Sequence, residues 1–159
     1  MSKIVIANAT PIVSLCSVRA EFILKELFHQ IVIPEGVRRE LRVLNKPGAD
    51  FPKLDWVEVR PVQNEEFVLA LRKDVDQGEA ETIALAKQLH ADIVIIDEQS
   101  GYQIAKRFDL PAVRTLSLLK IAKDKQIIQT VKPIVEEMLE KGRWYSQRVL
   151  DKFLRDIGE

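Results

Sequence analysis

The chain has 159 residues, 47% of them hydrophobic, and its 24 Lys and Arg residues balance its 24 Asp and Glu residues. This length and apolar content suit a single domain over residues 1–159, while the zero net charge argues against a protein that wraps duplex nucleic acid with a basic surface. No signal-peptide core and no run approaching the ~18 apolar residues of a membrane span are present, and the lone Cys16 excludes a disulfide framework, so we expect a soluble, cytoplasmic protein.

Five short runs rich in β-branched residues alternate along the chain with longer helical patterns. Most of these runs lack polar alternation, which is typical of strands that helices cover on both faces. The pattern therefore predicts an α/β fold with a central, mainly parallel sheet. The expected strands are KIVIA (3–7), QIVIP (30–34), WVEVR (56–60), DIVIID (92–97) and PAVRT (111–115).

Helix starts and stops are marked by prolines and glycines. Thr10 followed by Pro11 is a cap followed by a proline in the first turn, and Pro34 occupies a similar position. The stretch LNKPGADFPKLD (44–55) is the longest break and is expected to be a surface excursion. From residue 115 onward the pattern is helical, with stops at Gly142 and Gly158, so residues 115–159 are predicted to form a helical C-terminal extension of the same domain.

Several common catalytic motifs are absent from the sequence. There is no GxGxxG after a strand, no GxxxxGK[ST], no HExxH and no GxSxG. The two histidines, His29 and His90, fall near the C-terminal ends of predicted helices, where an imidazole suits the last carbonyl groups. Chemistry is therefore expected to rest on carboxylates acting through a metal ion.

Two polar side chains close predicted strands. Asn8 follows the strand at 3–7, and Asp97 ends the strand at 92–97. In doubly wound sheets the functional crevice lies beyond the carboxyl ends of the strands, so both residues face one crevice if the two strands are neighbours. The alternative is local, because Asn and Asp also cap turns and helices.

Glu40 belongs to the predicted helix EGVRRELRVL. At 100° per residue it borders the apolar stripe of Val37, Leu41 and Leu44, and therefore leans toward the edge of the core. An acid at that border needs a partner or a metal, although a solvated helix face is the alternative. The arginines of this helix point away from the stripe; they are Arg38, Arg39 and Arg42.

A second acidic helix start occurs in DVDQGEAETIALAKQLH. On a helix beginning near Gly78, Glu79 shares a face with Ile83 and Ala86, whereas Glu81 points elsewhere. The alternative for Glu79 is a first-turn acid favoured by the helix dipole. Four separate segments thus offer oxygen ligands of the kind that Mg²⁺ prefers, and the residues are Asn8, Glu40, Glu79 and Asp97.

Three stretches together resemble a known family. IVIANATPIVSL (4–15), IPEGVRREL (33–41) and DQGEAETIALAKQLHADIVIIDEQSGYQIAKRFDLPAVRT (76–115) are similar to PIN-domain proteins, specifically the prokaryotic, DUF3368-like branch with a D-x-G-E-A-E helix start and an I-D-E-x-x-G strand end. The resemblance covers nearly the whole chain. It implies a three-layer α/β fold with a central twisted sheet between helices, and Mg²⁺- or Mn²⁺-dependent ribonuclease activity of the type found in toxins of toxin-antitoxin pairs.

The resemblance also implies roles for single residues. Glu40, Glu79 and Asp97 match acids of the family, and Glu81 and Glu98 are auxiliary acids. Thr10 matches a small hydroxyl residue beside the first acid. The first acid itself, usually an aspartate, is replaced here by Asn8, which offers a carbonyl oxygen without a charge.

Two function hypotheses follow. In the first, the acids hold one or two Mg²⁺ or Mn²⁺ ions, Asn8 orients a metal-bound water, and RNA is cleaved. In the second, a PIN-like module of weakened metal affinity binds RNA or a partner protein without cleaving it. A cognate antitoxin and a second copy of the chain are the further partners considered. A response-regulator receiver is excluded, because no acidic pair follows the first strand.

Basic side chains on two helices are candidates for holding the RNA backbone. Phosphate groups attract Lys and Arg wherever these lie near the cleavage site, although a solvated helix face is the alternative for each of them. The candidates are Arg38, Arg39 and Arg42 near Glu40, and Lys106 and Arg107 after the Asp97 strand.

Overall fold

The computed structural model describes residues 3–43 and 47–159. Within these residues a central sheet has the strand order β3-β2-β1-β4-β5, and every strand pairing is parallel. The α/β prediction is confirmed, and the sheet expected to be mainly parallel is parallel throughout. The strands are β1 (Val5–Ala7), β2 (Ile31–Pro34), β3 (Val57–Arg60), β4 (Ile93–Ile95) and β5 (Ala112–Val113).

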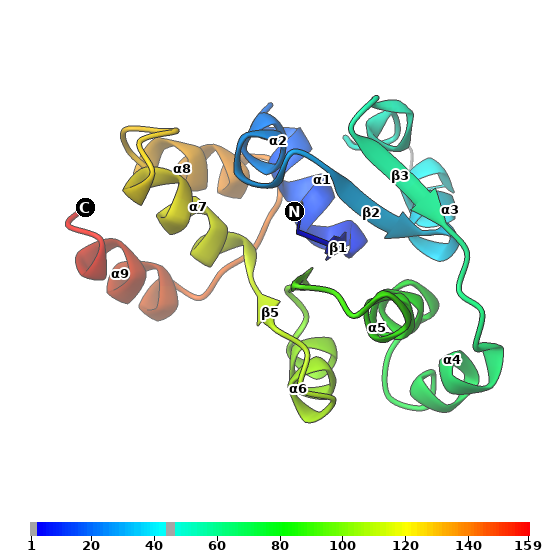
Figure 1. The fold of residues 1–159 in the computed structure, drawn as a ribbon. Helices are drawn as coiled ribbons and strands as arrows, with labels where there is room; N and C mark the ends of the chain where they lie inside the picture. Colours follow the sequence, from blue (N-terminus) through cyan, green and yellow to red (C-terminus); the bar gives the residue numbers. More distant parts are fainter. Residues whose placement is uncertain (1–2, 44–46) are drawn as a thin grey trace.

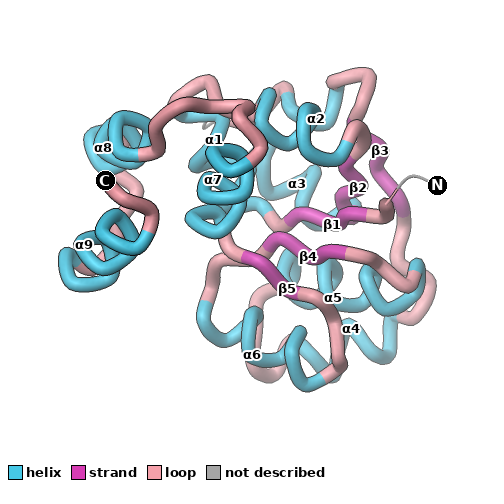
Figure 2. The backbone as a smooth tube through the Cα atoms, turned by 60° about the vertical axis from the view of Figure 1, so that its left-hand side comes forward, coloured by secondary structure: helices cyan, strands magenta, loops and turns pink. Residues whose placement is uncertain are grey.

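Helices cover both faces of this sheet, which gives the predicted three layers (Figures 1 and 2). Alternate strand residues enter opposite cores: Val5 and Ala7 pack with α1, α2, α7 and α8, whereas Ile6 packs with α4, α5 and α6. The helices of the described residues are α1 (Ala9–Ser17), α2 (Phe22–Phe28), α3 (Glu35–Val43), α4 (Glu65–Leu71), α5 (Gln77–Leu89), α6 (Gln99–Arg107), α7 (Thr115–Asp124), α8 (Lys132–Glu140) and α9 (Gln147–Asp156).

β1 and β4 are neighbours, which is the condition for Asn8 and Asp97 to face one crevice. Val5 pairs with Ile93 and Ala7 with Ile95, and the backbone N–H of Asn8 donates to the Ile95 carbonyl at 2.9 Å. The chain winds outward from β1 in both directions, so the strand order reverses between β1 and β4. The crevice of a doubly wound sheet therefore lies where Asn8 and Asp97 leave their strands.

The start of α1 differs from the prediction. Asn8, rather than Thr10, is the residue before the helix, and its backbone is extended at φ −82° and ψ 168°. Pro11 is the third helical residue, which is tolerated because the first four N–H groups of a helix have no partner within the helix. Pro34 likewise ends β2, and α3 begins at Glu35.

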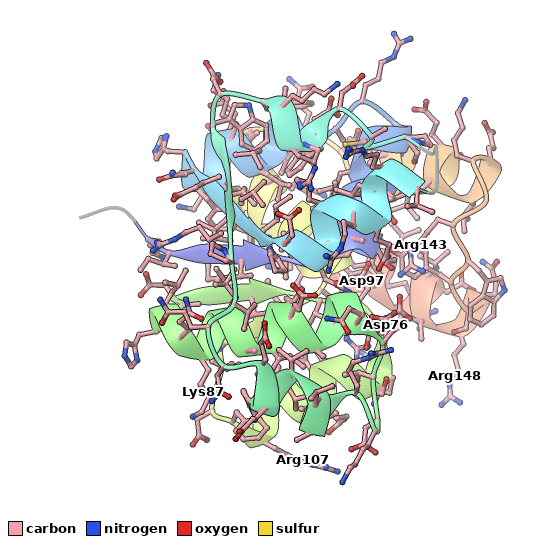
Figure 3. The ribbon with its side chains drawn as sticks, turned by 90° about the vertical axis from the view of Figure 1, so that its right-hand side faces the viewer. Asp76, Lys87, Asp97, Arg107, Arg143 and Arg148 are labelled. Atoms are coloured by element: carbon pink, nitrogen blue, oxygen red, sulfur yellow. The ribbon has the colours of Figure 1, made fainter. Side chains whose placement is uncertain are left out.

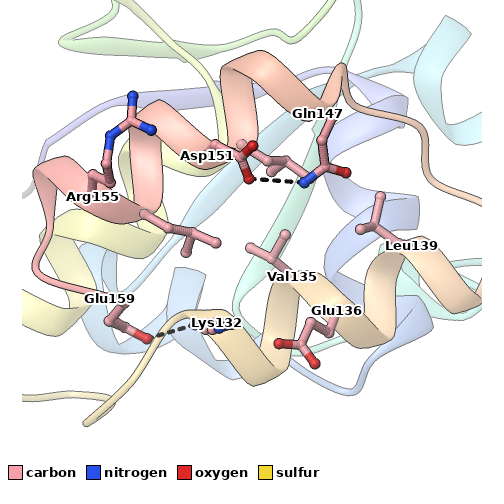
Figure 4. Close-up of a pocket in the computed structure, with 10 residues that line it drawn as sticks. Lys132, Val135, Glu136, Leu139, Gln147, Asp151, Arg155 and Glu159 are labelled. Carbon is pink, nitrogen blue, oxygen red and sulfur yellow. Dashed lines mark hydrogen bonds between the residues drawn. The ribbon is translucent and has the colours of Figure 1, made fainter.

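The helical C-terminal region is confirmed, and α7, α8 and α9 contribute buried side chains to the same core as α1 and α2 (Figure 1). Gly142 and Gly158 follow α8 and α9 with φ of +102° and +80°, as expected of helix stops. The Glu159 carboxylate accepts hydrogen bonds from the N–H groups of Val131 and Lys132 at the start of α8. Figure 4 shows the cavity of about 400 Å³ between α8 and α9.

The two histidines lie where the sequence predicts them, whereas the stretch at 44–55 lies partly in the core. His29 and His90 end α2 and α5, as expected. Of the stretch at 44–55, residues 44–46, and with them the predicted stripe residue Leu44, lie outside the described residues. Phe51 in the same stretch is buried and packs edge-on against Trp56, so this segment contributes to the core instead of lying wholly at the surface.

In the described part of the chain, no helix has the length and apolarity needed to cross a membrane.

Candidate functional site

The polar side chains at the carboxyl edge of the sheet come from several separate elements. Asn8 follows β1, Asp97 follows β4, and α5 contacts Asn8, since Thr82 on α5 donates to the Asn8 Oδ1 at 3.3 Å. In Figure 3 the labelled side chains of Asp76, Asp97 and Arg143 lie at this edge. The sheet topology therefore brings residues nearly 140 positions apart into one region.

Gly78 allows three oxygen atoms to gather at the start of α5. A Cβ atom at position 78 would lie 2.8 Å from Glu40 Oε1, and 3.7 Å from both Asn8 Oδ1 and Asp76 Oδ1. Asp76 caps α5 by accepting the Glu79 N–H at 2.8 Å. Asn8 itself is only 4% exposed. A side chain at position 78 would therefore push the Glu40 carboxylate away from the start of α5, whereas Asn8 and Asp76 would remain in ordinary contact.

Glu79 is the most perturbed acid of this region. Its side chain is buried, and within residues 3–43 and 47–159 its Oε2 has no hydrogen-bond partner. Burial, together with the negative charges of Asp76, Glu98 and Glu40, raises the pKa of Glu79 to about 8. Glu79 is therefore largely protonated at neutral pH, and a cation placed among these acids would favour its ionised form.

Asp97 has the opposite environment. Its carboxylate accepts the N–H and the hydroxyl of Thr115, each at 2.8 Å, and forms an ion pair with Arg143 at 3.1 Å. Arg143 comes from the segment between α8 and α9, and its guanidinium stacks on the Tyr145 ring at 4.4 Å. Burial raises the pKa of Tyr145 to about 12, with a further contribution from Asp97, so the phenol stays neutral. Arg143 thus balances the charge of Asp97.

The three auxiliary residues separate into two places. Thr10 donates to Glu98 Oε1 at 2.9 Å, and Glu98 also lies near Glu79, so this pair belongs to the carboxyl-edge site. Glu81 points to the other side of α5, where Oε1 accepts the Gly36 N–H at 3.0 Å. It lines a separate cavity of about 360 Å³ together with Arg39.

The five basic candidates lie apart from Asp97. Arg38 pairs with Glu35, Arg39 pairs with Glu81 at 3.4 Å, and Arg42 is exposed in the last turn of α3. Lys106 and Arg107 occupy the last turn of α6, whereas its first turn follows Glu98 at the carboxyl edge. Figure 3 shows Arg107 distant from the labelled Asp97. Arg143 does pair with an acid of this edge, Asp97, and the sequence did not single it out.

The oxygen atoms of this region suit a hydrated divalent ion. Of the residues that the structure describes, no three Asp, Glu, His or Cys side chains are arranged as a metal cage. Mg²⁺ does not require one, because it keeps several waters and binds through one or two carboxylates. The Glu79 Oε2, which has no partner in the described residues, and the oxygens around Gly78 are ligands of this kind, so the residues present fit the ion.

Three contributors to the site were missed from the sequence. Asp76 could have been found, because an Asp three positions before Glu79 is a typical helix cap. Thr115 was identified only as the start of a helix. Arg143 follows Gly142 in a segment with neither helical nor strand periodicity, so no local pattern indicates where its side chain goes.

Comparison with known proteins adds one match. The model of the family DUF3368, described as a PIN domain, matches residues 4–159. No curated protein matches the chain.

Proposed function

The chain belongs to the PIN-domain family, and on this premise we propose that it is a divalent-metal-dependent ribonuclease acting at the carboxyl edge of its sheet. The family points to a nuclease-type function, and PIN domains generally depend on divalent metals. The observation that carries the proposal is Glu79, a buried acid with an unpartnered oxygen among other acids. An acid in that environment is suited to binding a cation that neutralises it.

Glu79 and one further acid, Glu40 or Asp97, would hold Mg²⁺ or Mn²⁺ with the help of the Asn8 carbonyl oxygen, because in the described residues no three acids are arranged to hold one ion. The ion would lower the pKa of a bound water and stabilise negative charge on the scissile phosphate. Glu79 would release its proton on binding, and Thr10 would fix the orientation of Glu98 through their hydrogen bond. Arg143 would offer its guanidinium to a phosphate once the ion takes over the charge of Asp97.

A second candidate function is binding without cleavage. It is favoured by Asn8, which carries no charge, and by the ion pair between Asp97 and Arg143, which already satisfies one of the acids. In that case the protein would recognise RNA or a partner protein while holding metal weakly. We extend the ribonuclease proposal to a toxin role with a cognate antitoxin, to action in the cytoplasm and to assembly as a homodimer. The toxin role is supported by the family alone.

Cleavage of a mixed-sequence single-stranded RNA tests the proposal. The protein should cleave with Mg²⁺ or Mn²⁺ and stop when a chelator is added. Glu79→Gln should lower the rate at least about 100-fold, because metal sites lose about 10- to 100-fold when even an indirect partner of the ion is removed. Glu137→Gln, at an exposed position of α8, is the control and should cleave like the wild type. Chelator-resistant cleavage, or an active Glu79→Gln, would overturn the proposal.

A further inference from the structure

A groove of about 570 Å³ opens beside Asp97 and Glu98, between the ends of the sheet and α9. Three cations line it from three different segments: Arg114 precedes α7, Arg143 precedes α9, and Lys152 lies on α9. Arg143 and Lys152 are paired with the lining acids Asp97 and Asp156, so the groove offers separate contacts for single phosphates and is not a uniformly basic surface. The volume is in the range that accommodates a ligand of nucleotide size.

The same groove carries aromatic side chains. Trp144 is 75% exposed, whereas the chain's other tryptophan, Trp56, packs against Phe51. Tyr145 and Phe153 also line the groove and pack partly into the core, so their rings are held in place. An exposed indole next to fixed rings and cations is the combination with which proteins stack the bases of single strands.

Unsatisfied hydrogen-bonding atoms gather at this groove. Among the described residues, Arg114 Nε and Arg143 Nε are buried side-chain atoms without a partner, and the Tyr145 hydroxyl interacts with the Arg143 guanidinium. All three residues line the groove. Because the two Nε atoms are buried, a ligand in the groove would meet the terminal N–H groups of these guanidinium groups, which donate readily to phosphate oxygens. Arg114 is held against the Tyr102 ring at 4.2 Å, which fixes the position of its guanidinium.

We propose that this groove, lined by Arg114, Trp144 and Lys152, binds a single-stranded RNA segment with a base stacked on Trp144 and leads its backbone to Asp97 and Glu98. The inference rests on the proposed ribonuclease function and adds the surface on which the strand binds and the side chain on which a base stacks. A duplex does not fit this description, because its bases are stacked on one another and cannot cover an indole. Arg143 lies where the groove meets the acids, and therefore contacts both.

Binding in the presence of a chelator tests the groove without cleavage. We would measure fluorescence anisotropy of a labelled ten-nucleotide mixed-sequence RNA with the full chain. Trp144→Ala should weaken binding about tenfold, the loss expected for one stacked base. Leu69→Ala is the matched control, because Leu69 is 64% exposed on α4 and lies outside the groove. Equal affinities for both variants and the wild type would overturn the proposal.

Two lysines provide a matched pair for the charge contribution. Lys152 pairs with Asp156 at 2.7 Å and Lys120 pairs with Asp124 at 2.6 Å, both four residues apart on a helix, but only Lys152 lines the groove. Lys152→Gln should weaken binding and reduce the slope of log affinity against log salt by about 0.7. Lys120→Gln should change neither. Equal losses in the two variants would contradict a local phosphate contact.

Tryptophan emission gives a readout that does not depend on removing the stacking residue. In a Trp56→Phe background Trp144 is the sole tryptophan, and the single-stranded RNA should quench its emission. An unchanged emission would overturn the proposal, as would equal binding of a double-stranded RNA or selective capture of a protein with no RNA binding. If the protein cleaves RNA with metal but substitution of Trp144 changes nothing, only the proposal for the groove fails. If RNA binds in the groove but no metal supports cleavage, only the proposed ribonuclease function fails.

Discussion

Glu79 and Glu81 lie two residues apart on α5 and are both 6% exposed, yet their carboxylates have opposite hydrogen-bonding environments. Glu81 accepts hydrogen bonds from the Gly36 N–H at 3.0 Å and from Gln77 at 2.6 Å, and it pairs with Arg39. Glu79 has an oxygen without a partner in the described residues and stands among other acids. Burial alone therefore does not distinguish a structural acid from a functional one. What distinguishes them is whether hydrogen-bond donors surround the carboxylate.

Helix geometry separates the two side chains. Two residues correspond to a rotation of about 200°, so Glu79 and Glu81 leave α5 on nearly opposite sides. One side faces the carboxyl ends of β1 and β4, where Asn8 and Glu98 lie, and the other faces the start of α3. Substitutions at the two positions should therefore change the stability of the protein with opposite signs.

The largest effect on stability is expected from Glu81→Ala. The substitution leaves the buried Gly36 N–H without an acceptor and removes the partner of Arg39, so the free energy of unfolding should fall by about 2–4 kcal/mol. Urea unfolding measures the loss. Glu81→Gln, which keeps an acceptor for Gly36, should recover part of it. A Glu81→Ala variant as stable as the wild type would show that this acid is not structural.

A smaller effect of opposite sign is expected from Glu79→Gln. The pKa of Glu79 is about 8 in the folded protein and 4.5 ordinarily, so the stability due to its bound proton is complete below pH 4.5 and is lost as pH rises through 8. Glutamine remains neutral and avoids this loss. Fully expressed, this difference in pKa corresponds to about 5 kcal/mol, but water around the ionised carboxylate screens part of it, so at pH 9 in chelator the variant should be about 2 kcal/mol more stable than the wild type. At pH 4 the two should be alike.

Thermal unfolding from pH 4 to pH 9 checks the Glu79→Gln prediction. Glu137→Gln serves again as the control, and its pH profile should follow that of the wild type. Parallel profiles for Glu79→Gln and the wild type would mean that Glu79 titrates normally, and the contrast with Glu81 would disappear.

Asn8→Asp is expected to have the smallest effect on stability. The new charge would lie near Glu40 and Asp76, so the variant without metal should lose about 1 kcal/mol, and Mg²⁺ should restore it. RNA cleavage should rise, because charge is a main determinant of divalent-ion affinity. Melting temperatures with Mg²⁺, Mn²⁺ and chelator decide this. A loss without recovery would make Asn8 a turn residue whose amide serves the local fold.

The sequence predicted the elements whose causes are local. Apolar runs without polar alternation located the strands, and the polar residues directly after them, Asn8 and Asp97, were placed at the correct edge. Periodicity also separated Glu79 from Glu81. The partners of Asp97 could not be predicted, because Thr115 and Arg143 reach it through tertiary packing, 18 and 46 residues farther along the chain. Whether a buried acid is satisfied is decided by such distant donors.

Carbon-detected NMR titration of Glu79, with and without Mg²⁺, measures whether a divalent cation binds at this carboxylate. In chelator its carboxyl carbon should titrate near pH 8, because burial and the neighbouring acids hold the proton. With saturating Mg²⁺ the pKa should fall well below neutrality, since the ion favours the ionised form. A pKa near 4.5 in chelator, or one near 8 that Mg²⁺ leaves unchanged, would contradict a divalent-cation site at the carboxyl edge of the sheet.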